Sequence, residues 1–198
     1  MMLLDIEARI AACTLCAERF RATETAHEPR PVVYPSKTAR LMIAGQAPGA
    51  RVHASGVPFD DPSGDRLRDW MGIGRDMFYD TTRLAIVPMA FCFPGYDAKG
   101  SDLPPPKICA ETWRSSLLAQ MPQIELVLVI GQYAQGWHMG GERKRTLTET
   151  VRHWRDYGPH VLPLPHPSWR NTAWLKKNPW FEDEVLPHLR AEVARLAG

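Results

Sequence analysis

Four cysteines have a spacing suited to metal binding or redox chemistry. Cys13 and Cys16 form a CxxC pair, and Cys92 and Cys109 follow with sixteen residues between them. In a reducing compartment such thiols bind metals or exchange electrons, and disulfides are rare. A redox CxxC is expected just after a strand, whereas IEARIAACTLCAERF has the periodicity of a helix end. We therefore interpret the pair as metal ligands, with Cys92 and Cys109 completing a four-thiolate site. The alternative is that these last two are small core residues.

Three polar segments form a second group of candidates, because each follows an apolar run. GQAPG (45–49) follows the run 41–44, the Cys92 loop follows 84–91, and HPSWRN (166–171) follows 161–164. Ligands of open α/β sheets bind at the carboxyl ends of the strands. Glycines at 45 and 49 also let the backbone turn sharply and approach a ligand. These segments therefore predict a site by position alone.

The elements that position these segments follow from hydrophobic periodicity. Strands are predicted at 41–44, 84–91, 126–130 and 161–164, and Pro88 predicts an edge, a bulge or an early end in the second. Helical patterns cover 3–20, a segment from Ser63 (as N-cap) to Met71, 108–119, 133–138 and 181–196, where Pro187 is a candidate kink. Strands that alternate with helices predict a three-layer α/β/α sandwich with a central four-stranded parallel sheet, in a single domain over 1–198.

Composition limits the function classes. The chain has 198 residues, 44% of them apolar, and a net charge of +2, so polyanions must be bound by local patches. The basic segment 142–155 is interpreted as a solvated face, with phosphate contact as the alternative. No GxGxxG or GxxxxGK[ST] motif is present, which argues against dinucleotide and P-loop sites. Without a membrane-length apolar run or a basic signal segment, the sequence predicts a cytoplasmic protein. A monomer is the default expectation.

The order of motifs resembles a known family. GQAPG, then GVPF, then a C-terminal HPS resembles the uracil-DNA glycosylase superfamily, from about Cys13 to Arg170. The cysteine pattern is similar to that of its thermostable bacterial and archaeal families, whose four cysteines hold a 4Fe-4S cluster. The resemblance implies such a cluster as cofactor, with zinc as the alternative. In that interpretation the cluster has a structural role and cross-links the N-terminal helix to the Cys92 loop.

The resemblance also implies roles for residues around the predicted site. A glycosylase takes the base out of the stack and stabilises both the cationic sugar and the anionic leaving base. Phe59 matches the aromatic residue on which the family stacks the flipped base, with a core phenylalanine as the alternative. Backbone N–H groups near Gln46 and Ala47 are expected to face the base or the water. His166 matches the histidine that donates to the base oxygen.

This sequence departs from the family at the carboxylate that activates water. GQAPG places Gln46 and Ala47 where many relatives have Glu or Asp. One iron-sulfur branch instead has an aspartate in a D-x-S-G context after the Phe, and here that residue is Asp61. We expect Asp61 to orient water and stabilise the cationic sugar; the alternative is that it caps the following helix. A family Asn that reads uracil is replaced by Pro88, so the substrate base stays open.

HPSWRN adds an expected contact with DNA. Ser168, Trp169 and Arg170 lie in the loop that, in the family, inserts a side chain into the minor groove. Trp169 is the candidate wedge, and packing of Trp169 on Trp174 or Trp180 is the alternative. The predicted function is a DNA base-excision repair glycosylase that hydrolyses the N-glycosidic bond of uracil or another deaminated base. A nucleic-acid-binding member of the superfamily without catalysis is the alternative.

Overall fold

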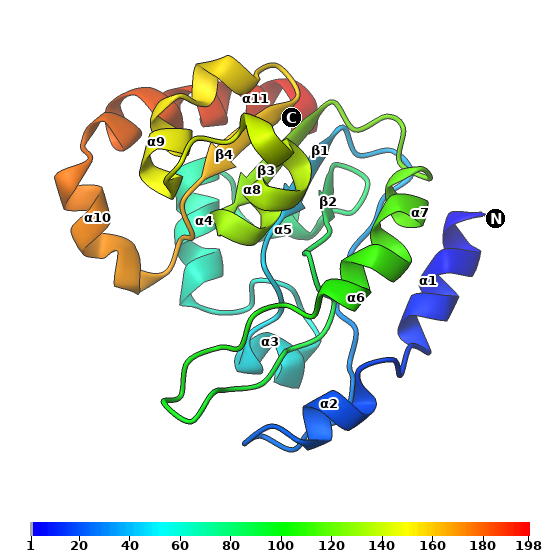
Figure 1. Cartoon of the computed structure of the whole chain (residues 1–198). Coiled ribbons are helices and arrows are strands. Elements are labelled where there is room, and N and C mark those ends of the chain that lie inside the picture. The colour runs from blue at the N-terminus through cyan, green and yellow to red at the C-terminus, as the bar shows by residue number, and fades with distance from the viewer. Residues whose placement is uncertain (1) are drawn as a thin grey trace.

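A computed structural model of the chain describes residues 2–198 and contains a four-stranded parallel sheet between helical layers (Figure 1). The spatial order is β2-β1-β3-β4. Leu41 pairs with both Leu84 and Leu126, and Val127 pairs with Val161. The strands are β1 (Leu41–Ala44), β2 (Leu84–Ile86), β3 (Leu126–Ile130) and β4 (Val161–Leu164). The predicted three-layer α/β/α sandwich with a parallel sheet is confirmed.

Short helices make up most of the two outer layers. The α-helices are α1 (Leu3–Ala11), α2 (Ala17–Arg21), α3 (Ala50–Ser55), α4 (Pro62–Met71), α5 (Arg75–Tyr79), α6 (Lys107–Cys109), α7 (Ser115–Leu118), α8 (Gly131–Met139), α9 (Leu147–Arg152), α10 (Thr172–Lys177) and α11 (Leu186–Ala197). Two π-helical turns, Ala110–Arg114 and Phe181–Val185, join α6 to α7 and lead into α11. Three 3₁₀ turns are Gly140–Glu142, Trp154–Tyr157 and Trp169–Asn171.

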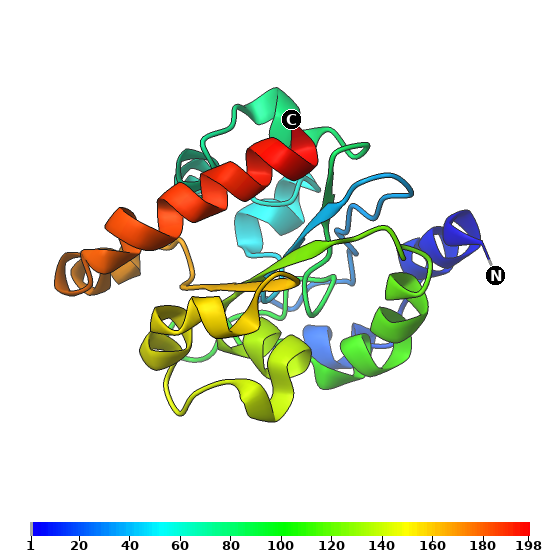
Figure 2. The ribbon, with the colours of Figure 1, turned by 90° about the horizontal axis from the view of Figure 1, so that it is seen from above.

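Alternating side chains of each strand pack against different helical layers, because successive residues of a strand point to opposite faces. Leu41 and Ile43 of β1 belong to the cluster that includes α4, α5 and α11. Met42, between them, packs with α1 and the segment from α6 to α7. Both faces of the sheet are therefore covered, as Figure 2 shows, which explains why β1 is apolar at every position.

Two predicted elements end earlier than expected. The helix predicted at 3–20 is two helices, since α1 ends at Ala11 and α2 begins at Ala17. The CxxC pair lies in the connection between them, just past the end of α1, as the helix-end pattern predicted. The second strand ends at Ile86, two residues before Pro88, and β2 is an edge strand as the proline predicts. Tyr34 exchanges two backbone hydrogen bonds with Ile86, of 2.9 and 2.7 Å, and so covers the outer edge of β2.

Pro187 causes no break within the closing helix. It lies in the first turn of α11, where its missing N–H costs nothing, and the preceding turn is π-helical. In residues 2–198 no helix combines the length and the apolar character needed to cross a membrane.

Candidate active site

The loop after β1 is held against the segment after β2 by backbone hydrogen bonds. The Gly45 carbonyl accepts from the Met89 amide at 2.9 Å, and the Gln46 carbonyl accepts from the Ala90 amide at 3.1 Å. A Cβ at Gly45 would lie 3.4 Å from Cζ of Phe59. The glycine therefore lets this ring lie directly against the loop backbone.

Phe59 has a strained backbone conformation that is held by the close packing of its neighbours. Its φ is +55°, in the left-handed region that side chains other than glycine rarely adopt. A Cβ at Gly64 would lie 1.8 Å from the Phe59 carbonyl oxygen, so the first turn of α4 packs closely on it. The ring meets Phe78 edge to face, with 6.0 Å between centroids. Strained residues of this kind concentrate at functional sites, where they fix a side chain in one orientation.

Asp61, and not Ser63 as predicted, is the N-cap of α4. Its Oδ1 accepts a hydrogen bond of 2.9 Å from the Gly64 amide. Pro62 occupies the first helical position, which places the cap one residue before it. Oδ2 of Asp61 makes no hydrogen bond with residues 2–198, so one carboxylate oxygen is free to face a ligand. Capping and a direct role in the site are therefore compatible in one side chain.

His166 follows β4 and lies near Asp61. Burial lowers the pKa of His166 below its usual value, and the negative charge of Asp61 acts in the opposite direction. The imidazole is therefore neutral near pH 7 and carries one N–H donor. The Asn171 side chain donates a hydrogen bond of 2.7 Å to the backbone carbonyl of His166, which fixes the loop that follows.

One cavity joins the five residues that the sequence predicts for base binding and catalysis. It has a volume of about 40 Å³, room for water molecules. Its wall also includes Val32, from the segment before β1, and Pro88, neither of which was predicted as a site residue. The predicted site residues that line it are Gln46, Ala47, Phe59, Asp61 and His166.

The loop after His166 presents its tryptophan to solvent. The Trp169 side chain is 70% exposed, whereas Trp174 and Trp180 pack on Phe181 in the core. The packing alternative for Trp169 is therefore wrong. Arg66 of α4 donates a hydrogen bond of 2.9 Å to the Ser168 carbonyl and so ties this loop to the helix that Asp61 caps.

Asp102 is a carboxylate near the site that the sequence did not select. Although its side chain stays partly open to solvent, desolvation raises its pKa; Arg170 lowers it and the like charge of Asp61 raises it further. Asp102 lies in the loop 92–109, which the sequence suggested only as support for cysteines. No motif or periodicity in this glycine- and proline-rich loop marks Asp102 as a site residue.

The four cysteines come together at one place in the fold. Cys13, Cys16, Cys92 and Cys109 line a cavity of about 20 Å³ together with Phe20 and Trp113. Burial raises the pKa of the Cys92 thiol to about 12 and that of Cys109 to about 11. Four convergent thiols are a donor set for zinc or an iron-sulfur cluster. Within residues 2–198, no three histidine, cysteine or carboxylate groups already stand close enough to hold a metal ion, so the metal site stays a prediction.

A buried arginine holds the segment after β2 that includes Pro88. Arg114 has no exposed surface and donates to the carbonyls of Val87 at 3.0 Å and Pro88 at 2.9 Å. Its Nη2 lies 2.6 Å from Nε2 of His138. Burial, and then the Arg114 charge, lower the pKa of His138 to about 3. His138 is therefore the neutral acceptor of this pair.

Comparison with known proteins places the chain in a family. A solution NMR structure of a proposed uracil DNA glycosylase from Methanosarcina acetivorans is similar at 17% identity and a TM-score of 0.46, over 79% of this chain and 94% of that chain. Residues 31–190 match the sequence profile of the uracil DNA glycosylase superfamily. That range contains the whole His166 cavity and the loop of Trp169. Since the match spans most of the 198 residues, the chain belongs to the uracil DNA glycosylase superfamily.

Proposed function

We propose that the chain is a DNA glycosylase that hydrolyses the N-glycosidic bond of a deaminated base. The observation that carries the proposal is the single cavity at the strand ends that contains Phe59, Asp61 and His166. An aromatic face, a carboxylate and a neutral imidazole are the groups this reaction needs, and the superfamily is one that acts on DNA.

Each of these side chains has a separate task in the proposed reaction. The base leaves the stack and lies on the ring of Phe59, whose backbone strain fixes its orientation. The bond between C1′ and the base breaks while the oxygen of a water molecule bonds to C1′. The N–H of neutral His166 stabilises the negative charge on the leaving base. Oδ2 of Asp61 holds the water, accepts the proton that this water loses as its oxygen bonds to C1′, and stabilises the cationic sugar.

The substrate base is set by the few polar groups of the cavity. Pro88 offers no side-chain hydrogen bond, and its carbonyl accepts from Arg114. Gln46 is the one amide side chain in the cavity wall, and its donor and acceptor can pair with the edge of a base. Such a readout suits uracil or another deaminated base. A cavity of about 40 Å³ is too small for a base as it stands, so binding opens it.

The loop of Trp169 is proposed as the contact with the rest of the DNA. Its indole is exposed and projects from a turn that Arg66 anchors, as an intercalating wedge requires. Ser168 and Arg170 would contact phosphates on either side. Cation–π contact with Arg170, whose Cζ lies 5.9 Å from the Trp169 ring centre, limits the orientations of the indole before DNA arrives.

The four cysteines are proposed to hold a 4Fe-4S cluster, with zinc as the alternative. When bound, the group cross-links the connection after α1 to the loop 92–109 and supplies no atom to the hydrolysis. Cys109 also accepts a contact of 3.4 Å from the Phe91 amide. The cysteine site is therefore joined to the segment that carries Pro88.

A DNA-binding protein without hydrolysis is the second candidate function. It is favoured by the lack of a carboxylate at Gln46 and Ala47 and by the engagement of one Asp61 oxygen as a helix cap. Such a protein would bind DNA through the same surface but would not hydrolyse the N-glycosidic bond.

Single-turnover base release separates the two candidates. The substrates are single- and double-stranded oligonucleotides that contain uracil, hypoxanthine or xanthine. The variants are Asp61→Asn, His166→Ala and, as a matched control, Asp69→Asn, whose carboxylate faces solvent from the same helix. We expect release by the native protein and the control, and loss with Asp61→Asn. Absence of release from every substrate by folded, DNA-binding protein would favour the second candidate.

A further inference from the structure

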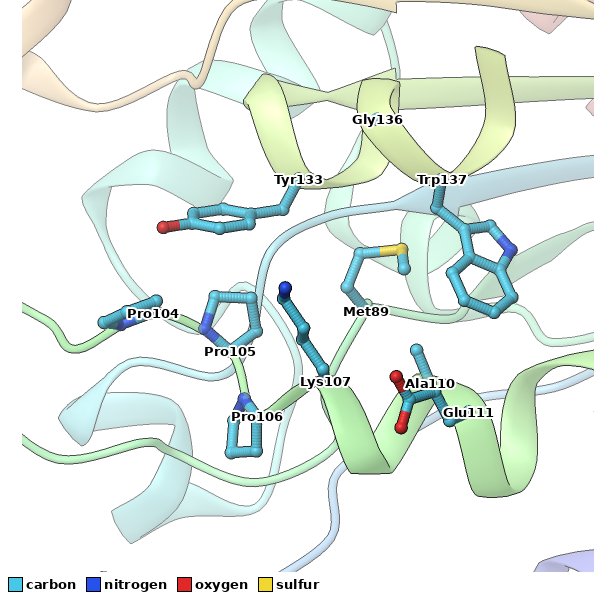
Figure 3. A pocket seen from close by; sticks show the side chains of 10 residues that line it. All are labelled: Met89, Pro104, Pro105, Pro106, Lys107, Ala110, Glu111, Tyr133, Gly136 and Trp137. Carbon is cyan, nitrogen blue, oxygen red and sulfur yellow. The ribbon is translucent and has the colours of Figure 1, made fainter. Parts of the chain in front are cut away.

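A second cavity, of about 360 Å³, opens beside the first and has no part in the proposed hydrolysis (Figure 3). It lies between α8 and the segment Pro104–Pro106, which leads into α6. Its volume falls within the range of roughly 300–1,000 Å³ that is typical of small-ligand sites.

The two cavities are separated by consecutive residues. Pro88 lines the first cavity and Met89 lines the second. The Met89 amide is bonded to the Gly45 carbonyl, so this partition is fixed to the loop after β1. Tyr133 reaches the second cavity from the start of α8, just after β3. Both cavities therefore lie at the carboxyl edge of the same sheet, on either side of one segment of backbone.

Flat apolar faces dominate the wall of the second cavity. Tyr133 and Trp137 are four residues apart on α8 and therefore project from the same side of the helix. Figure 3 shows the Tyr133 ring above Pro104 and Pro105 and the Trp137 indole above Ala110 and Glu111, with Met89 between the two. Trp137 is 40% exposed, so part of its indole is open to a ligand. A planar ring fits such a wall, because aromatic and proline faces offer stacking area without demanding particular hydrogen bonds.

Positive charge lies beside these faces. The ammonium group of Lys107 points into the cavity between Tyr133 and Met89 (Figure 3), and among residues 2–198 it forms no hydrogen bond or ion pair. Glu111 is the one carboxylate in the wall. A ring that carries a phosphate matches this combination.

We propose that the second cavity binds an unpaired nucleobase of the same DNA strand, one or two nucleotides from the base in the first cavity, with a phosphate at Lys107. The inference rests on DNA as the ligand of the proposed function. The occupant must be unpaired and unstacked, because a base inside a duplex has no free face for Tyr133 and Trp137. The proposal therefore predicts a preference for single-stranded or locally opened DNA.

Equilibrium binding tests this proposal without requiring catalysis. Short single-stranded oligonucleotides carry a tetrahydrofuran unit in place of one nucleotide, moved position by position around a central uracil, and fluorescence anisotropy gives each Kd. For the native protein, omission of one base next to the uracil is expected to weaken binding about ten-fold. Trp137→Ala should weaken binding to the complete strand by a similar factor and abolish the sensitivity to that omission. Trp137→Phe should restore both.

Of two further variants, the first is a control and the second tests the phosphate contact. Ile108→Ala removes an exposed apolar side chain of α6 that does not line the cavity, and it should keep the native profile. Lys107→Gln should lower the slope of log Kd against log salt concentration by about 0.7.

A flat omission profile in the native protein, or native sensitivity retained in Trp137→Ala, would overturn the proposal. Binding of an apolar peptide, with DNA affinity unchanged in Trp137→Ala, would also overturn it and assign the cavity to a protein partner. If the profile is found but no base is released, only the glycosylase proposal fails. If base release is intact and the profile is flat, only this inference fails.

Discussion

Replacement of Asp61 separates its observed role as a helix cap from its proposed role in catalysis, because its two carboxylate oxygens have different surroundings. Oδ1 caps α4 through the Gly64 amide at 2.9 Å, and Oδ2 has no protein partner in residues 2–198. Asp61→Asn keeps an oxygen that can accept from Gly64 but removes the charge. Asp61→Ala removes both the cap and the charge.

The two substitutions should have equal effects on the rate and unequal effects on stability. Asn is as good an N-cap as Asp, whereas Ala costs about 1 kcal/mol in free energy of unfolding. For a chain of 198 residues that corresponds to a fall in Tm of about 2–4 °C. Loss of the charge that holds water should slow base release by about 10²–10⁴-fold in both variants.

Single-turnover base release with enzyme in excess gives the rate, and thermal unfolding of the same preparations gives Tm. Asp69→Asn, on the solvent side of α4, should match the native protein in both. If Asp61→Asn releases base at the native rate and only Asp61→Ala is slow, Asp61 acts through the helix alone and the proposed chemistry is refuted. If Asp61→Asn is slow and also melts lower by as much as Asp61→Ala, the capping argument fails.

Further predictions concern the groups that support the site. Arg114→Met leaves two carbonyls after β2 without their donor, and should cost about 3 kcal/mol, measured by urea unfolding. The pKa of His138 is about 3 in the fold, so the unfolded chain takes up a proton near pH 6.5 and the folded chain does not. The contribution of neutral His138 to the free energy of unfolding is therefore fully present above pH 6.5. It falls as the pH drops towards 3, by up to about 1.4 kcal/mol per pH unit, and His138→Gln should reduce this dependence of the free energy of unfolding on pH. Gly64→Ala places a Cβ against the Phe59 carbonyl and should destabilise the chain by about 1–3 kcal/mol while slowing base release. Anaerobically purified protein should contain about four iron atoms per chain, and Cys92→Ser should lower that content.

Long apolar runs made the sheet predictable. All four strands are buried on both faces, so each is a continuous apolar segment of the sequence. Helix boundaries were less certain, since they depend on local capping. The prediction of Ser63 as N-cap overlooked that Pro62 favours the first helical position, which assigns the cap to Asp61.

Contacts between distant segments could not be predicted in the same way. No periodicity indicates that the loop 92–109 brings Asp102 near Asp61 and Arg170. The sequence also did not predict the burial of Arg114, because a charged residue in an amphipathic helix is normally assigned to the solvent face. The motifs suggested which side chains belong to the base site, but the groups that tune and support those side chains come from elsewhere in the chain.

The segment 87–91 explains how a substitution at the cysteines can reach the base site without taking part in its chemistry. The Phe91 amide contacts Cys109 at 3.4 Å, the Met89 amide holds the loop after β1, and Arg114 binds the Pro88 carbonyl. Pro88 itself has no N–H to bond, so its position depends on that arginine and on its two neighbours. A shift at Cys109 is therefore passed along the backbone to the wall between the two cavities. A cysteine variant that still folds should change DNA affinity and the omission profile of the second cavity more than the pH dependence of base release, because the Asp61 and His166 side chains lie outside this segment.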